Sequence, residues 1–293
     1  MTKLNSSRLS LIAAMCIFST IGLLRKYIDL PSGTVALARA VFGTLFLAAL
    51  MLLRKQKLDI AAIRKNGLLL LLSGMALGIN WMLLFEAYNH TTVATATLCY
   101  YMAPILLILV SPFLFREKIN LRKALCCAAA VVGIVLVSGV MRTGFSVSGD
   151  LQGILLGLGA AFFYACVVAL NKKIQGIAPL SRTILQLAIS SLMLLPYTLL
   201  AEDLTSVSLN STVLLLLAVA GIVHTGIAYA LYFDSVSSLS AQTSALLSYI
   251  DPILAIILSA IFLREAVGAE VIIGAILILG AAVVSEYQPK NPN

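Results

Sequence analysis

The chain has 293 residues, of which 61% are apolar (AVILMFWYC) and only 11% are charged. Ordinary soluble domains are about 45–50% apolar and about 25% charged, so this chain has too few charges to cover a water-exposed surface. Its net charge of +8 lies in short clusters between apolar runs. That pattern is typical of membrane topology signals and not of a nucleic-acid-binding surface. The composition therefore argues against a soluble enzyme and predicts a polytopic membrane protein.

Charge clusters and turn residues divide the chain into ten apolar stretches, each near the ~20 residues that a helix needs to cross a bilayer. The predicted spans are 8–25, 34–53, 67–88, 92–115, 121–140, 151–171, 183–201, 211–233, 240–263 and 267–285. None shows the period-two alternation of a barrel strand, so all are expected to be helices. The predicted fold class is an all-α integral membrane protein with ten transmembrane helices.

The distribution of Lys and Arg predicts the orientation of these spans. With the N-terminus in the cytoplasm, 15 of the 20 basic residues fall in cytoplasmic segments, four fall outside and Arg39 lies within the second span. This excess is what the positive-inside rule requires. We therefore expect a multi-pass protein of the cytoplasmic membrane, with both termini in the cytoplasm and an uncleaved first span.

The two halves of the sequence resemble each other at an offset of 148 residues. Residues 78–117 and 226–265 align without a gap and share 14 identities, including Tyr-x-x-Pro-Ile-Leu and a later Arg-Glu pair. We predict two repeats, 1–145 and 146–293, of five spans each. Because five is odd, the second repeat is expected to be inverted in the membrane. Inverted repeats are typical of secondary transporters that work by alternating access.

The sequence resembles the drug/metabolite transporter superfamily in its EamA-type branch. The resemblance is carried by the Ala-Pro-Ile segment 103–105, the Asp-Pro-Ile segment 251–253 and the Arg-Glu pairs 116–117 and 264–265. It implies a central cavity enclosed by spans 1–4 and 6–9, with spans 5 and 10 peripheral. It also implies a small organic substrate, such as an amino acid or an amine. The first span contains no acid between residues 13 and 24, so the essential glutamate of the four-span relatives is not carried over.

Asp251 is the strongest single candidate for a functional residue. A carboxylate near the middle of a span is costly unless it meets a cavity or a partner. Pro252 leaves the carbonyl of Ser248 without its helical donor, and Ser244, Ser248 and Asp251 share a helix face. Asp251 is therefore predicted to bind a cation or carry a proton. The alternative is a buried carboxylate that neighbouring hydroxyls satisfy.

Three further ionisable residues lie in or near the predicted spans. Glu86 lies near the outer end of span three, where it is either a proton acceptor or an interfacial residue. Arg39 is predicted to contact Glu86 or a substrate carboxylate, with snorkelling to the interface as the alternative. His224, deep in span eight, is either a satisfied core histidine or a proton relay.

Aromatic and amide side chains inside the spans suggest the walls of a substrate cavity. Buried tyrosines need partners for their hydroxyl groups, and aromatic faces attract cations. The predicted substrate-binding residues are Asp251, Trp81, Tyr101, Tyr229, Tyr249, Ser248, Asn80 and Arg39, and the candidates for proton coupling are Asp251, Glu86 and His224. The alternative for the aromatic residues is ordinary packing.

The favoured function is a secondary active transporter for an amino acid or an amine, with the proton as candidate coupling ion. The alternatives are an intramembrane lipid-modifying enzyme that uses Asp251 and His224, and a non-transporting membrane sensor. The sequence contains no nucleotide fingerprint, no HExxH and no CxxC spacing among its five cysteines. We therefore expect no cofactor, no metal and no catalytic residue. The expected partners are the substrate and the lipid bilayer, and the expected assembly is a monomer or a weak homodimer.

Overall fold

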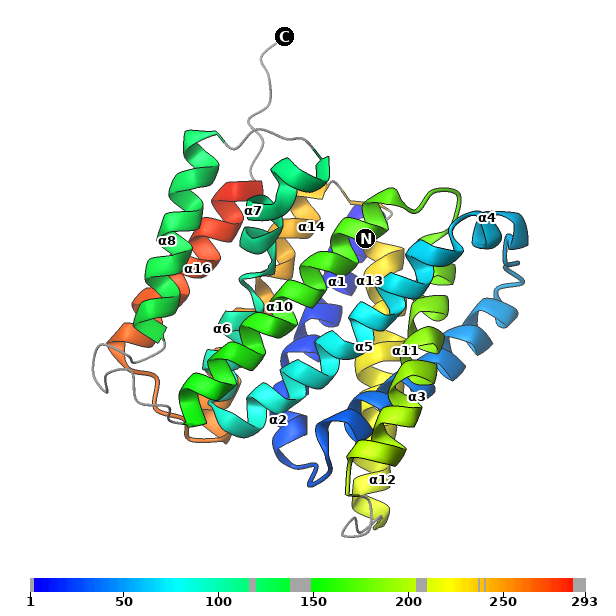
Figure 1. Cartoon of the computed structure of the whole chain (residues 1–293), viewed down its shortest axis with the longest axis horizontal. Helices are drawn as coiled ribbons and strands as arrows, with labels where there is room; N and C mark the ends of the chain where they lie inside the picture. The colour runs from blue at the N-terminus through cyan, green and yellow to red at the C-terminus, as the bar shows by residue number, and fades with distance from the viewer. Residues whose placement is uncertain are drawn as a thin grey trace.

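The computed structural model describes residues 3–115, 120–137, 149–203, 210–236, 238–239 and 241–286, and their regular structure is entirely helical. The helices lie side by side in one bundle (Figure 1). Their bounds are α1 Lys3–Ser19, α2 Ile21–Lys26, α3 Ser32–Leu53, α4 Ile60–Lys65, α5 Gly67–His90, α6 Val93–Tyr100, α7 Ala103–Phe115, α8 Leu121–Val137, α10 Gly149–Lys173, α11 Pro179–Ala201, α12 Ser211–Ala218, η1 Val219–Ile227, α13 Ala228–Val236, α14 Ala241–Ser248, α15 Ile250–Phe262 and α16 Ala269–Glu286.

Among the residues that the structure describes, seven segments are long and apolar enough to cross a membrane. They are Asn5–Lys26, Ser32–Leu53, Gly67–His90, Val93–Val110, Asp150–Lys173, Pro179–Ala201 and Ser211–Val236. Leu246–Phe262 and Ala269–Ser285 are shorter apolar helices. Large apolar side chains such as Leu53 and Leu200 stay more than four-fifths exposed, as a lipid environment allows. The all-α membrane fold class is confirmed, whereas the count of ten spans stays a prediction.

Two of the predicted spans are broken at equivalent positions. The fourth span divides into α6 and α7 at Tyr101, and the ninth divides into α14 and α15 at Tyr249, 148 residues later. Each break lies three residues before a proline, Pro104 or Pro252, whose missing N–H removes a helical hydrogen bond. The shared Tyr-x-x-Pro motif therefore forms a helix break in both halves.

The eighth predicted span contains a π-helical segment. In η1, which lies between α12 and α13, the chain makes a wider turn over nine residues. Gly221 and Gly226 of this segment face Phe42 and Phe46 of α3 so closely that a Cβ at either glycine would overlap the phenylalanine. Glycine thus lets η1 and α3 approach each other.

Helices that are equivalent at the offset of 148 residues form equivalent packing pairs. In the core of the bundle α5 packs on α10, and the equivalent helices α13 and α1 also pack on each other. The pairs α3–α11 and α8–α16 each join equivalent helices. The last pair lies at one edge of the bundle (Figure 1), where a Cβ at Gly274 would lie 2.7 Å from the carbonyl oxygen of Gly133. Only glycine permits this close contact of backbones.

Carboxylates cap two helix N-termini across the halves. Glu202 accepts hydrogen bonds from the backbone N–H groups of Gly33 (2.7 Å) and Thr34 (2.8 Å) at the start of α3. Glu265 accepts one from Val93 (2.9 Å) at the start of α6. Negative charge at a helix N-terminus is favourable because the first N–H groups lack helical partners. Glu265 of the second Arg-Glu pair therefore has a structural role, while residues 116–117 of the first pair lie outside the described residues.

Candidate functional site

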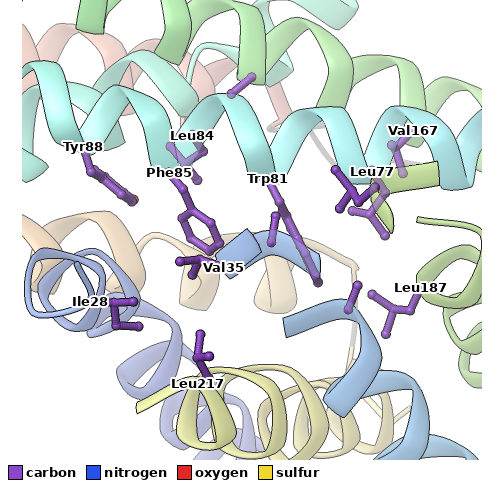
Figure 2. Packing of buried hydrophobic residues seen from close by; sticks show 14 of the residues in the cluster. Ile28, Val35, Leu77, Trp81, Leu84, Phe85, Tyr88, Val167, Leu187 and Leu217 are labelled. Atoms are coloured by element: carbon purple, nitrogen blue, oxygen red, sulfur yellow. The ribbon is translucent and has the colours of Figure 1, made fainter. Parts of the chain in front are cut away.

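Arg39 lies in the interior of the bundle and is only 5% exposed. Its guanidinium carbon is 3.9 Å from the centroid of the Trp81 ring and 5.7 Å from that of Phe85. Figure 2 shows both rings pointing from α5 toward α3, the helix that carries Arg39. The distance to Trp81 is that of a cation–π contact. The aromatic rings of α5 therefore hold the guanidinium group inside the protein.

The structure places the Arg39 side chain neither beside Glu86 nor at the surface of the bundle. Its side chain does not reach the interface, and its Nε–H donates to Thr225 Oγ1 (2.9 Å) rather than to Glu86. Within the described residues, no carboxylate lies within ion-pair distance of Arg39 and no acceptor binds its terminal amino groups. Arg39 thus has free donors for an anionic group.

Thr225 can bind Arg39 because of the π-helical turn. Its hydroxyl group donates to the carbonyl of Ala220 (3.2 Å), five residues earlier, and so keeps a lone pair for Arg39. A carbonyl five residues back is the acceptor that π-helical geometry presents. Our sequence reasoning missed Thr225, since a single threonine in an apolar span is not a recognisable signal.

Asp251 lies in the first turn of α15, directly after the helix break. It accepts a hydrogen bond from the Tyr101 hydroxyl group (2.8 Å). Its charge also interacts electrostatically with that of Arg39. The Ser248 hydroxyl group donates to the carbonyl of Ser244 (2.8 Å) and does not satisfy the carboxylate. The hydroxyl partner of Asp251 therefore comes from the other half of the chain.

Aromatic rings lie beside Asp251, and the Tyr101 ring carries the hydroxyl group that binds it. The Tyr101 ring centroid lies 6.3 Å from that of Tyr249 and 6.0 Å from that of Tyr100. Tyr100, Tyr101 and Asp251 each keep some accessible surface. We call these residues, together with Arg39 and Trp81, the polar site. Tyr229 is likewise partly exposed.

Two of the predicted site residues are held in contacts between helices. The side chain of Asn80 is fully buried and its amide donates to the carbonyl of Ala160 (2.6 Å), which joins α5 to α10. His224 is buried between Thr20 Oγ1 (2.8 Å) and the carbonyl of Val219 (3.2 Å). Both ring nitrogens of His224 therefore have a hydrogen-bond partner in a neighbouring part of the chain. These contacts give His224 no direct bond to Asp251.

Glu86 and Asp234 occupy equivalent positions but have different partners. Glu86 accepts hydrogen bonds from Ser32 (2.7 Å) and Asn89 (3.1 Å) and lies 3.0 Å from His90. Asp234 forms a two-pronged ion pair with Arg54, both bonds being 2.8 Å long. These hydrogen bonds raise the pKa of Arg54 above its usual value. Both carboxylates lie near the C-terminal ends of their helices.

An apolar groove of about 420 Å³ runs between α15 and α16. Ile253, Ile257 and Ile276, which line it, are also exposed to the surroundings of the bundle. Its lining includes Tyr249 but neither Arg39 nor Asp251. The groove is therefore a surface feature of the membrane-embedded region and not the polar site.

No group of three or more His, Cys, Asp or Glu side chains with metal-binding geometry occurs among the described residues. The functional groups of the polar site are instead one guanidinium, one carboxylate and several phenols. Such a set binds a ligand through charges, hydrogen bonds and aromatic faces.

Comparison with known proteins places this architecture in a family. Residues 6–139 and 151–286 each match the model of the EamA-like transporter family. The chain therefore belongs to this family of multi-pass membrane transporters. Its general function is therefore the transport of small molecules across a membrane.

Individual relatives agree with this assignment. The chain is 30% identical over 254 residues to the "uncharacterized transporter YxxF" of Bacillus subtilis, which is 87% of this chain and 81% of that protein. It is 28% identical over 254 residues to protein RarD of Salmonella typhi, with 82% and 80% covered. A solved crystal structure superposes with a TM-score of 0.65 at 22% identity, covering 96% of this chain and 97% of that one. This last likeness concerns the fold alone.

Proposed function

We propose that the protein is a secondary active transporter that moves an amino acid across the cytoplasmic membrane by alternating access. The observation that carries this proposal is the pairing of Arg39 and Asp251, two opposite charges without a direct ion pair, in one aromatic interior. A zwitterion complements both charges at once. The carboxylate of the substrate binds the free amino groups of Arg39, and its ammonium group binds Asp251.

The aromatic walls fit the rest of such a substrate. Trp81 already holds Arg39, while Tyr100, Tyr101 and Tyr229 keep accessible surface beside the two charges. Phenol rings accept apolar side chains and ammonium groups alike. An amine without a carboxylate leaves Arg39 unsatisfied, so we favour an amino acid over a simple amine.

Alternating access rests on two inverted repeats, 1–145 and 146–293. The equivalent helix breaks, the matching helix pairs and the double match to the family model support this division. The first residues of α1, the last residues of α16 and α4 lie at the same end of the bundle in Figure 1. With the basic segments, this agrees with a cytoplasmic location for both termini. Two such repeats form similar packings open to either side.

Asp251 is the proposed proton carrier. Protonation removes the negative charge that holds the substrate ammonium, so proton binding and substrate binding compete at one carboxylate. His224 and Glu86 are bound to other groups and are not needed for this exchange. The lipid-modifying enzyme considered from the sequence needs Asp251 and His224 to act together, and they have separate partners.

Reconstitution into liposomes tests the proposed function. Vesicles preloaded with unlabelled amino acids should take up radiolabelled amino acid by counterflow. An amino acid should compete with the labelled substrate, whereas the amine that lacks its carboxylate should compete poorly. If no proteinogenic amino acid exchanges, or if the amine competes equally well, the proposal is wrong.

A further inference from the structure

One end of the bundle carries a concentration of exposed positive charge. It comes from two connections that are far apart in the sequence, the α3–α5 connection with α4 and the α10–α11 connection. We call this surface the basic face, and it consists of the exposed side chains Lys55, Lys57, Arg64, Lys65, Lys172 and Lys173.

Direct contacts hold the two connections together. Asn66 Nδ2 donates to the carbonyl of Gln175 (2.9 Å), and the backbone N–H of Gln175 donates to Asn66 Oδ1 (3.4 Å). A Cβ at Gly176 would lie 3.5 Å from the Cβ of Ala62 in α4. Figure 1 shows α4 beside the chain that leaves α10. The cations of both connections therefore belong to one surface.

Little negative charge within the two connections offsets these cations. Asp59 is the only acidic residue in the sequences 54–66 and 172–178. Its carboxylate accepts a hydrogen bond from the backbone N–H of Ala62 (2.9 Å) and so caps α4. Arg54 is excluded from the basic face because Asp234 already binds it. The surface thus attracts anions.

Exposed apolar side chains lie directly beside the basic face. Leu52 and Leu53 at the end of α3 are 71% and 81% exposed. Ile60 of α4 is 55% exposed and Leu68 of α5 is 68% exposed. Such residues belong at the level where acyl chains meet headgroups. The cations therefore lie at the depth of the lipid phosphates.

We propose that the basic face binds the headgroups of anionic phospholipids, of the phosphatidylglycerol class, in the leaflet where α3 ends. Lys and Arg beside a membrane segment interact with anionic lipid phosphates, and the adjacent leucine and isoleucine side chains contact the acyl chains. A free phosphate ion would satisfy the charges but not these apolar groups. This surface includes neither Arg39 nor Asp251, so the proposal is independent of the transported substrate.

Binding of a short-chain lipid tests the proposal. The full-length protein in zwitterionic detergent is titrated with dioctanoyl phosphatidylglycerol, and binding is measured by microscale thermophoresis. We expect saturable binding that weakens with added salt, little binding of dioctanoyl phosphatidylcholine and no competition by millimolar inorganic phosphate. Equal binding of both lipids overturns the proposal, and so does displacement by phosphate alone.

Two double variants that remove the same amount of charge provide the matched comparison. Arg64→Gln with Lys65→Gln should weaken binding of the phosphatidylglycerol by about tenfold. Lys26→Gln with Arg264→Gln, outside the basic face, should leave binding unchanged. Equal weakening by both pairs indicates nonspecific attraction and contradicts the proposal. Should the first pair prove unstable by circular dichroism, the charge-conserving pair Arg64→Lys with Lys65→Arg must still bind the lipid like the unmodified protein.

Discussion

At one pair of equivalent positions, the first half of the chain has a regular helix and the second half has an irregular one. In the first half, α5 is a continuous α-helix from Gly67 to His90. The equivalent part of the second half consists of α12, the π-helix η1 and α13. Leu77 in α5 corresponds to Thr225 in η1, the residue that binds Arg39. The irregular half therefore supplies a polar contact that the regular half lacks.

The other residues of the candidate site include some that the two halves share and some that they do not. Tyr101 and Tyr249 are shared by the two halves and mark the helix breaks. Asp251 corresponds to Ala103, and Arg39 corresponds to Leu187. Shared residues thus build the framework, whereas the unshared residues carry the charges of the candidate site. The following predictions test this division.

The largest effect is expected for Arg39→Gln, which removes the positive charge that one half contributes. The substrate carboxylate then loses its charged partner in a desolvated site, so the substrate Kd should rise on the order of 100-fold. Counterflow and direct binding in detergent measure this change. Arg39→Lys should lose less, because it keeps the charge but not the planar contact with Trp81. Normal affinity in the glutamine variant would exclude Arg39 from the binding site.

Asp251→Asn tests the negative charge of the second half. Under a gradient of one pH unit, a one-proton exchange accumulates substrate up to about tenfold. The variant should accumulate none, because its amide cannot release a proton. Asp234→Asn is the control, since that carboxylate lies at a helix end and binds Arg54. Accumulation by the Asp251 variant that still follows the pH gradient would contradict the proposed coupling.

Thr225→Val tests whether the π-helical segment positions Arg39. The variant loses the hydroxyl acceptor of the Arg39 Nε–H, and a hydrogen bond to a charged group contributes about 1.5–3 kcal/mol. We expect a rise of about tenfold in the Kd of the amino acid, with a smaller effect on an amine without a carboxylate. Thr44→Val is the matched control, because its hydroxyl group binds its own helix at Ala40. Equal effects on both ligands would indicate a structural role only.

Gly226→Ala tests the close contact between η1 and α3. The added methyl group would overlap the ring of Phe46, so the variant should lose about 1–3 kcal/mol of stability. Thermal unfolding in detergent measures the loss as a lower Tm. Gly280→Ala is the control, because no packed atom lies within 4 Å of the place that its added methyl group would take. An unchanged Tm in the first variant would mean that the two helices separate without cost.

The smallest effect is expected for Arg54→Gln, which breaks the ion pair with Asp234. The equivalent residues at the other end are Glu202 and Glu86, so this pair has no counterpart. Its side chains are 37% and 55% exposed, and exposed pairs contribute about 0–1 kcal/mol. A double-mutant cycle with Asp234→Asn measures the coupling. A coupling well above this range would show that the pair holds α3 to α13 more firmly than its exposure implies.

Much of the fold is predictable from the sequence because a bilayer leaves few alternatives. Long apolar runs must form helices there, since no water satisfies an exposed backbone. Pro252 also indicated where the ninth span loses a helical hydrogen bond, and that span is broken three residues earlier, at Tyr249. The partners of individual polar residues were less predictable. Asn80 proved to join two helices, and Arg39 turned to Trp81 instead of Glu86. Such contacts depend on how distant helices pack.

The sequence by itself determined the membrane class, the approximate helix positions and the internal repeat, because apolar length and periodicity act locally along the chain. Only the tertiary structure decided that Tyr101 binds Asp251, that Thr225 binds Arg39, and that two basic connections form one surface. These contacts join residues that are more than a hundred positions apart. Their geometry is set by helix breaks, close glycine contacts and a π-helical turn, whose combined effect no local pattern records.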